Sequence, residues 1–217
     1  MQFSWKRTLI VGTAFLSISV LWPVFNQFIP IFLQAGNPRW EQDLLAAGKQ
    51  LPQVRGFGLS PTIAFFIMTW DNLINVFVQP WAGARSDRTW NQFGRRKPWI
   101  LVGAPIALIA FVFIPLANTL LAIMVFIVVT NIGMALFRSP AVAWLGDLFP
   151  PEQRSKANGL LNLMGGVGAA LALFGGGLLF DRFGRAAPFF GAAVVMVAEK
   201  VIESGRRFAA HLLETAE

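Results

Sequence analysis

The most regular feature of the sequence is an alternation of long apolar runs with short polar connections. A helix that crosses a lipid bilayer needs about 20 mostly apolar residues. Six runs meet or approach this length: residues 8–33, 60–83, 99–116, 120–145, 157–180 and 186–198. The sixth is the weakest, because a helix of about 13 residues reaches about 20 Å and the hydrocarbon core is about 30 Å thick. The pattern predicts an all-α integral membrane protein with six transmembrane helices.

The segments outside the runs complete the predicted organisation. The polar stretch 34–58 contains one segment, 40–47, that favours a short surface helix. The tail 199–217 carries apolar residues near helical spacing, which predicts an amphipathic helix on the cytoplasmic surface. We therefore expect a six-helix transmembrane bundle at 1–198 and a tail at 199–217. The first run is too long for a cleaved signal peptide and has no small-residue cleavage site after it.

The composition supports a membrane protein. Hydrophobic residues make up 55% of the 217 and charged residues 13%, where globular proteins average about one quarter charged. These values exclude a soluble domain, and the 21 Phe and 8 Trp exclude a disordered chain. With no Cys and one His, His211 in the tail, the sequence offers no thiolate site, catalytic triad or metal cluster. We expect no enzyme activity, no metal and no cofactor.

The net charge of +7 is explained by membrane topology. With six spans, twelve of the eighteen Lys and Arg residues fall on the side that holds both termini, five fall on the other, and Arg138 lies within the fourth run. The positive-inside rule then places both termini in the cytoplasm of a multi-pass protein of the cell (inner) membrane. Nucleic-acid binding would need the bases on one solvated face, and here they are divided between loops.

The connection between the second and third runs carries the strongest motif. It reads G-x-x-x-D-R from Gly83 to Arg88, followed by G-R-R from Gly94 to Arg96. A topology anchor explains the bases but leaves Asp87 and the two glycines without a role. A carboxylate and arginines between two spans can instead form a latch that pairs in one conformation and breaks in another. The candidate latch residues are Gly83, Asp87, Arg88, Gly94, Arg95, Arg96, Asp147 and Arg154.

This loop resembles the signature loop of the major facilitator superfamily. Ser86-Asp87-Arg88, followed by Phe93-Gly94-Arg95-Arg96-Lys97-Pro98, is similar to the sucrose–proton and glycoside–cation symporters of that superfamily. The stretch from Arg138 to Gly159 resembles the fourth span of that branch and the loop after it. The likeness covers residues 8–190.

The resemblance implies a fold, a function and partners. The six helices would form two inverted three-helix repeats, which is one half of a twelve-span carrier. The protein would transport a sugar-like solute, coupled to a proton or sodium ion, as a homodimer or with a second six-helix half. The alternative is a non-transporting membrane scaffold or assembly subunit, or a truncated carrier without transport activity. No nucleic-acid partner is expected.

A second copy of the motif follows the fifth run. Residues 177–185 read G-x-x-x-D-R-x-G-R, on the opposite side of the membrane from the first copy. An inverted repeat would place the two motifs at equivalent positions. Chance is the alternative, because short charged turns suit any interfacial loop.

Polar residues within the runs are candidates for coupling and substrate binding. Asp71 is the only acid at membrane depth, where a charge costs about 2.5–3.5 kcal/mol on insertion scales, so it needs a partner or a water-filled cavity. Arg138 matches an arginine of the resembling family; it either binds a sugar hydroxyl, pairs with Asp71 or Asp147, or extends toward the interface. The amide candidates are Gln27, Asn72, Asn75 and Asn131, for which interhelical hydrogen bonds are the alternative.

Overall fold

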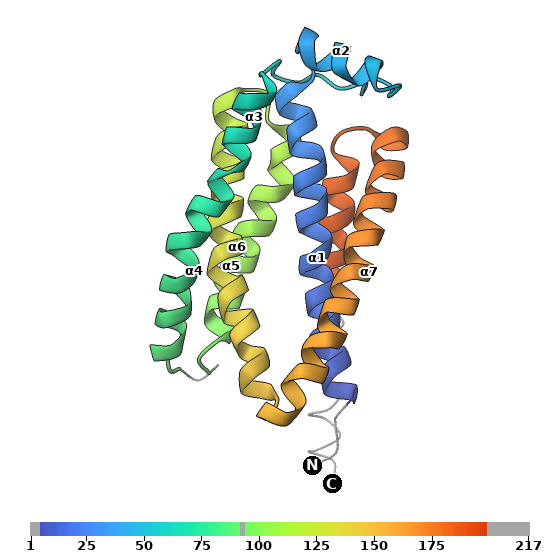
Figure 1. Ribbon diagram of the computed structural model, residues 1–217. Coiled ribbons are helices and arrows are strands. Elements are labelled where there is room, and N and C mark those ends of the chain that lie inside the picture. The colour runs from blue at the N-terminus through green and yellow to red at the C-terminus, as the bar shows by residue number, and fades with distance from the viewer. Residues whose placement is uncertain (1–4, 92–93, 199–217) are drawn as a thin grey trace. The chain divides into compact units, whose positions relative to one another are not determined.

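The computed structural model describes residues 5–91 and 94–198, and over these residues the protein is all-helical (Figure 1). The elements are α1 (Trp5–Gln34), α2 (Pro38–Ala46), α3 (Pro61–Met68), α4 (Trp70–Arg88), α5 (Lys97–Phe113), the 3₁₀ helix η1 (Ile114–Leu116), α6 (Leu120–Leu148), α7 (Pro151–Phe183) and a further apolar helix, Ala187–Ala198. Every apolar run of the sequence is helical, which confirms the predicted all-α class. The predicted tail, 199–217, lies outside the described residues.

Four of the helical segments in the described chain are long and apolar enough to cross a membrane. They are Pro61–Arg88, which joins α3 and α4, Lys97–Leu116, Leu120–Ala143 and Pro151–Phe183. These segments confirm a multi-pass membrane protein. The arrangement of six helices as two inverted repeats stays a prediction.

The chain divides into two compact units. One contains α1 up to Phe25, α7 and the helix Ala187–Ala198, and the other contains Asn26–Leu148 together with Gly184–Ala186. In the first unit α1 packs on α7 through small residues. A Cβ at Gly168 would lie 2.6 Å from the backbone oxygen of Leu16, so the two backbones are in direct contact there.

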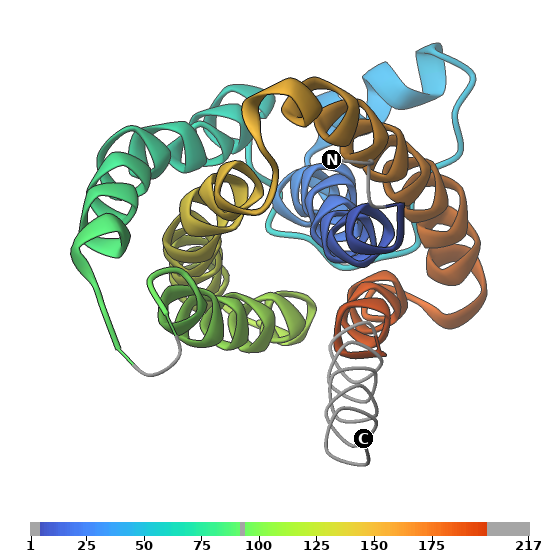
Figure 2. The same ribbon diagram turned by 90° about the horizontal axis from the view of Figure 1, so that it is seen from below.

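In the second unit α6 lies between α4 and α5 (Figure 2). The contact with α5 is close because glycines stand on both sides of it. A Cβ at Gly133 would lie 2.5 Å from the backbone nitrogen of Ala107, and one at Gly103 would lie 2.9 Å from that of Phe137. Small residues that let helix backbones touch are the usual basis of helix packing in membranes, where the hydrophobic effect between helices is weak.

The connection after α1 closes the end of that helix. The backbone N–H groups of Phe57, Gly58 and Leu59 donate to the carbonyls of Phe32, Ala35 and Leu33 at 2.9–3.0 Å. These carbonyls lie at the C-terminal end of α1, where the last C=O groups of a helix have no N–H donor within the helix itself. The segment 57–59 therefore acts as a cap built from backbone.

The short helix predicted on the surface within residues 40–47 is α2. Pro38 occupies the first turn, and the Asn37 side chain caps the helix by accepting from the N–H groups of Arg39 and Trp40 at 3.1 Å. No residue of α2 is buried. The prediction of a short surface helix is confirmed.

Several helices extend beyond the apolar runs that predict them, and three of these extensions, in α4, α6 and α7, continue into charged sequence. The polar residues at the end of α4, up to Arg88, are helical, α6 continues to Leu148, and α7 begins at Pro151. Arg85 and Arg88 favour the extension of α4, because cations stabilise the negative end of the helix dipole. Proline at the first position and Glu152 in the first turn favour the early start of α7. As a result, Asp87 and Asp147 lie in the last turns of helices and not in loops.

Candidate functional site

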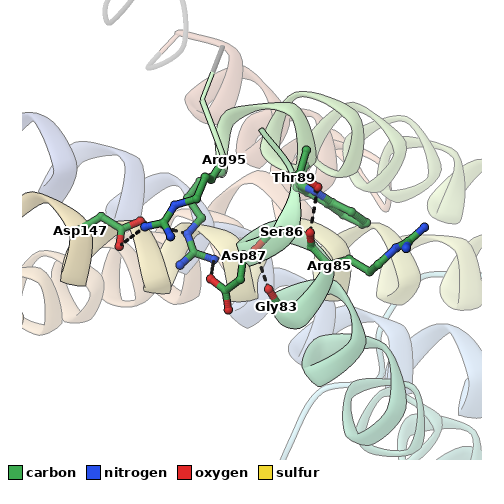
Figure 3. A network of polar contacts seen from close by, with 9 residues as sticks. Gly83, Arg85, Ser86, Asp87, Thr89, Arg95 and Asp147 are labelled. Carbon is green, nitrogen blue, oxygen red and sulfur yellow. Dashed lines mark hydrogen bonds and ion pairs between the residues drawn. The ribbon is translucent and has the colours of Figure 1, made fainter. Parts of the chain in front are cut away.

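Arg96 is the centre of a polar network at one end of the second unit, whose members Ser86, Asp87 and Asp147 are labelled in Figure 3. Its Nε lies 3.1 Å from Oδ2 of Asp147, at the end of α6, and its Nη1 lies 2.5 Å from Oδ1 of Asp87, at the end of α4. Nη1 also donates to Oγ of Ser86 at 2.7 Å. The Arg96 side chain is 9% exposed. One buried guanidinium thus joins the ends of α4 and α6 at the start of α5.

Arg95 adds a second ion pair to the same carboxylate. Its Nη2 lies 3.1 Å from Oδ1 of Asp147, so the two oxygens of Asp147 face two different arginines. The guanidinium of Arg95 also stacks over the Trp90 ring at 5.4 Å. In Figure 3 Arg85 extends away from these ion pairs. Of the basic residues in and around this loop, Arg95 and Arg96 are therefore the ones that form the ion pairs of the network.

Two glycines of the motif have clear local roles. Gly94 has a φ of 87°, in the left-handed region that favours glycine, and it reverses the chain before Arg95. A Cβ at Gly83 would lie 2.8 Å from Oγ of Ser139, so α4 approaches α6 closely one turn before the ion pairs. Ser86, fully buried, donates to the Gly83 carbonyl at 2.8 Å while it accepts from Arg96. The motif therefore has a structural role: Gly83 lets α4 approach α6, and Ser86 links the Gly83 carbonyl to Arg96.

The structure brings together most of the predicted latch residues. Gly83, Asp87, Gly94, Arg95, Arg96 and Asp147 meet in the network. Arg88 is exposed, and Arg154 donates from Nε to the backbone carbonyl of Phe149 at 3.0 Å. Sequence reasoning missed Ser86 as a participant, although its position one residue before Asp87 in the motif was the available signal.

Asp71 lies in the first turn of α4, directly after an interruption between α3 and α4 at Thr69. The Thr69 hydroxyl donates to the Phe66 carbonyl at 2.7 Å, a bond back into the preceding turn that locally distorts helices. Within the described residues Asp71 forms no ion pair, and it is half-buried. The interruption was not predicted, because the sequence there reads as one apolar run.

The predicted amides differ in their surroundings. Asn131 on α6 is 1% exposed, and neither its amide nitrogen nor its amide oxygen has a hydrogen-bond partner; the hydroxyl of the adjacent Thr130 is also unpartnered. Gln27 and Asn75 each bury an unpartnered side-chain oxygen, while Asn72 is exposed. Buried amides without partners are costly, so they indicate positions that bind water or a ligand. Thr130 was missed by sequence reasoning.

Arg138 is exposed on α6 and forms no ion pair within the described part of the chain. The carboxylate of Asp147, one of its two suggested partners, is occupied by Arg95 and Arg96. The structure therefore does not bring Arg138 to Asp147. Its suggested contact with a sugar stays a prediction.

The residues described contain no group of three or more His, Cys, Asp or Glu side chains able to hold a metal ion. The apolar helices indicate a multi-pass membrane protein, whose second unit has ion pairs between helix ends and buried amides without hydrogen-bond partners in its helices.

A sequence model described as Major Facilitator Superfamily matches residues 7–202, and the chain belongs to that family of membrane transporters.

Individual relatives agree with this assignment. The chain is 28% identical over 147 residues to "Sucrose transport protein SUC3" of Arabidopsis thaliana, a match that covers 58% of this chain and 25% of that protein. It is 27% identical over 203 residues to "Proton-associated sugar transporter A" of Homo sapiens, covering 85% of this chain and 24% of that protein. The match to each relative thus covers about a quarter of its length.

Proposed function

We propose that the protein is a half-size secondary carrier that moves a sugar-like solute across the cell membrane together with a cation, most simply a proton. It would act as a homodimer or with a second six-helix half, and both termini would face the cytoplasm. The observation that carries the proposal is the network at Arg96, in which one buried cation is shared by carboxylates of two different helices. The names of the matched relatives support the solute and the proton.

The network has the properties of a latch. A buried ion pair gains little net stability over well-packed apolar groups, but breaking it by moving one partner leaves a costly unpaired charge. Here Asp87 and Asp147 belong to the ends of α4 and α6, so a relative movement of those ends must break or re-form contacts with Arg96. Such a network favours two discrete arrangements over a continuum.

Asp71 is the proposed coupling residue. It is the one acid within the candidate span Pro61–Arg88 that stands away from the span's polar end, and no described cation pairs with it. A carboxyl shielded from water can be protonated at one stage of a cycle and ionised at another. Gln27, Asn75 and Asn131 offer amide groups, which both donate to and accept from hydroxyls, for contact with a neutral polyhydroxyl solute.

The test is uptake by the purified chain in liposomes. Radiolabelled neutral mono- and disaccharides are offered under an inward proton gradient, with and without an uncoupler. We expect accumulation that the uncoupler abolishes and that Asp71→Asn reduces to the level of empty liposomes. Asp43→Asn is the matched control, because Asp43 is an exposed acid on α2 and its replacement removes the same charge.

Each alternative gives a different result. If the chain moves none of the sugars, alone or with any six-helix protein that co-purifies with it, it is not a carrier of this class. A stable complex with other membrane proteins, unaffected by Asp71→Asn, would favour the scaffold function. Equal loss of uptake in Asp71→Asn and Asp43→Asn would remove the coupling role of Asp71.

A further inference from the structure

Arg185 occupies a built polar site at the end of the second unit opposite to Arg96. Its Nη2 donates to the backbone carbonyl of Ala117 at 2.9 Å, and its Nη1 lies 3.5 Å from the carbonyl of Arg55. The guanidinium also stands over the Phe32 ring at 5.3 Å. These three contacts come from the last turn of α1, from the connection before α3 and from the turn between η1 and α6. All of them lie within one compact unit.

The cation at this site is the Arg185 guanidinium itself, and its contacts include no carboxylate among the described residues. Among the described residues Arg185 forms no ion pair, its Nε is buried without a hydrogen-bond partner, and desolvation lowers the pKa of its guanidinium. An arginine side chain nonetheless stays protonated. Carbonyl dipoles and the face of an aromatic ring therefore stabilise the charge, and its planar fork reaches two carbonyls at once.

The position of Arg185 matches that of Arg95, a neighbour of Arg96 in the same network, in the two copies of the sequence motif. Gly94, with a φ of 87°, precedes Arg95 and Arg96, and Gly184, with a φ of 83°, precedes Arg185. Arg95 lies just before the third predicted span and contacts the end of the fourth, at Asp147. Arg185 starts the sixth predicted span and contacts the end of the first, at Phe32. An inverted three-helix repeat relates the first span to the fourth and the third to the sixth, so it predicts this exchange of partners.

We propose that Arg185 is a clamp that holds the end of α1, the connection before α3 at Arg55 and the η1–α6 turn together at the end of the second unit remote from Arg96. Unlike the Arg96 network, the clamp uses backbone carbonyls and a ring, which carry no net charge and cannot be lost by protonation. It therefore fastens its end of the unit in all states. The inference does not depend on transport, because its test measures local opening.

Because the sequence contains no Cys, a single introduced thiol is the only one that a maleimide can label, which allows a direct test of the clamp. Ala117→Cys places one thiol beside the acceptor carbonyl of the clamp, and Ala117 itself is only 4% exposed. The full chain in liposomes is labelled with a membrane-impermeant maleimide, and the labelling rate is compared between Ala117→Cys alone and Ala117→Cys with Arg185→Gln. We expect the second to be labelled about tenfold faster, the factor that corresponds to about 1.4 kcal/mol.

Two controls separate the clamp from a loss of charge or of overall stability. Arg182→Gln removes an exposed arginine three residues away and should leave the rate unchanged. Ala110→Cys reports from another buried position, 4% exposed on α5, and its labelling should not rise with Arg185→Gln. Arg185→Lys keeps the charge but not the planar fork, so it should be labelled nearly as fast as Arg185→Gln. If Arg185→Gln does not accumulate in the membrane, Arg185→Lys and Phe32→Leu carry the test.

The clamp is supported if Arg185→Gln and Arg185→Lys both speed the labelling of Ala117→Cys and do not speed that of Ala110→Cys. An unchanged rate at Ala117→Cys overturns it. So does an equal rise at Ala110→Cys, which would show a general loosening, or full protection in Arg185→Lys, which would show that charge is sufficient.

Discussion

Asp147 and Asp87 share Arg96 but are not equivalent partners. Asp147 contacts two arginines and is 33% exposed, whereas Asp87 contacts Arg96 and is 56% exposed. Exposed ion pairs contribute little, because water screens them. Asp147 is therefore the more important anchor of the latch.

Replacing Asp147 should destabilise the protein more than replacing Asp87. We expect Asp147→Asn to cost about 1–2 kcal/mol, the lower range for hydrogen bonds to charged groups because part of Asp147 is in solvent, and Asp87→Asn to cost about 0–1 kcal/mol. Thermal unfolding in detergent, followed by size-exclusion chromatography, measures the order of the two variants. Equal melting temperatures for both variants would contradict this ranking.

Individual residues of the latch could be predicted from the sequence, but their partners could not. The motif singled out Arg95 and Arg96 because a glycine followed by a basic cluster stands out in an apolar chain. Ser86 and Arg185 were not singled out as site residues, since a serine in a helix end and an arginine in a short turn become informative only when the fold brings acceptors to them.

The packing of α5 on α6 depends on a helix surface without side chains at Gly103 and Gly133. Alanine normally stabilises a helix relative to glycine by about 0.5–1 kcal/mol. At Gly133 the added Cβ would lie 2.5 Å from the Ala107 backbone, whereas at Gly166 on α7 nothing lies within 4 Å. The same substitution should therefore have opposite effects at the two positions.

We expect Gly133→Ala to lower the thermal midpoint, at a cost of about 1–3 kcal/mol for overpacking, and Gly166→Ala to leave it unchanged or raise it. The two variants are matched in chemistry and differ only in the neighbouring helix. A midpoint for Gly133→Ala at or above that of the unmodified chain would show that α5 and α6 do not touch as described.

The apolar runs predicted which segments are helical, but they did not predict where the helices end. Hydropathy stops at the membrane surface, but the backbone hydrogen bonds of α4 and α6 continue into polar sequence. This difference has a functional meaning, because Asp87 and Asp147 lie in those extensions and not in loops. The interruption at Thr69, where the hydroxyl donates to the Phe66 carbonyl, was equally absent from the hydropathy pattern.

At the scale of the whole molecule, one exposed face of α7 carries polar groups that are unfavourable in lipid. Asn158 and Asn162 are exposed on α7, within the candidate span Pro151–Phe183. Amides at membrane depth favour protein or water over lipid. The proposed partner, a second copy or another six-helix half, would cover these amides if it packs on this face.

If the chain pairs with a second copy, the cysteine-free sequence allows a direct test. Asn162→Cys should form disulfide-linked dimers under mild oxidation in liposomes, while Leu101→Cys, 61% exposed on α5, should not. Equal cross-linking at both positions would indicate random collision and would remove α7 as the pairing face.

The central claim is that the Arg96 network is closed in one conformation of a carrier and open in another. Spin labels at Arg88→Cys on α4 and Val142→Cys on α6, both exposed, report the separation of the two helix ends in liposomes. The account predicts two distance populations whose ratio changes when a transported sugar and a proton gradient are added, and a shift toward the longer distance in Asp147→Asn. A single distance that stays the same under all these conditions would contradict it.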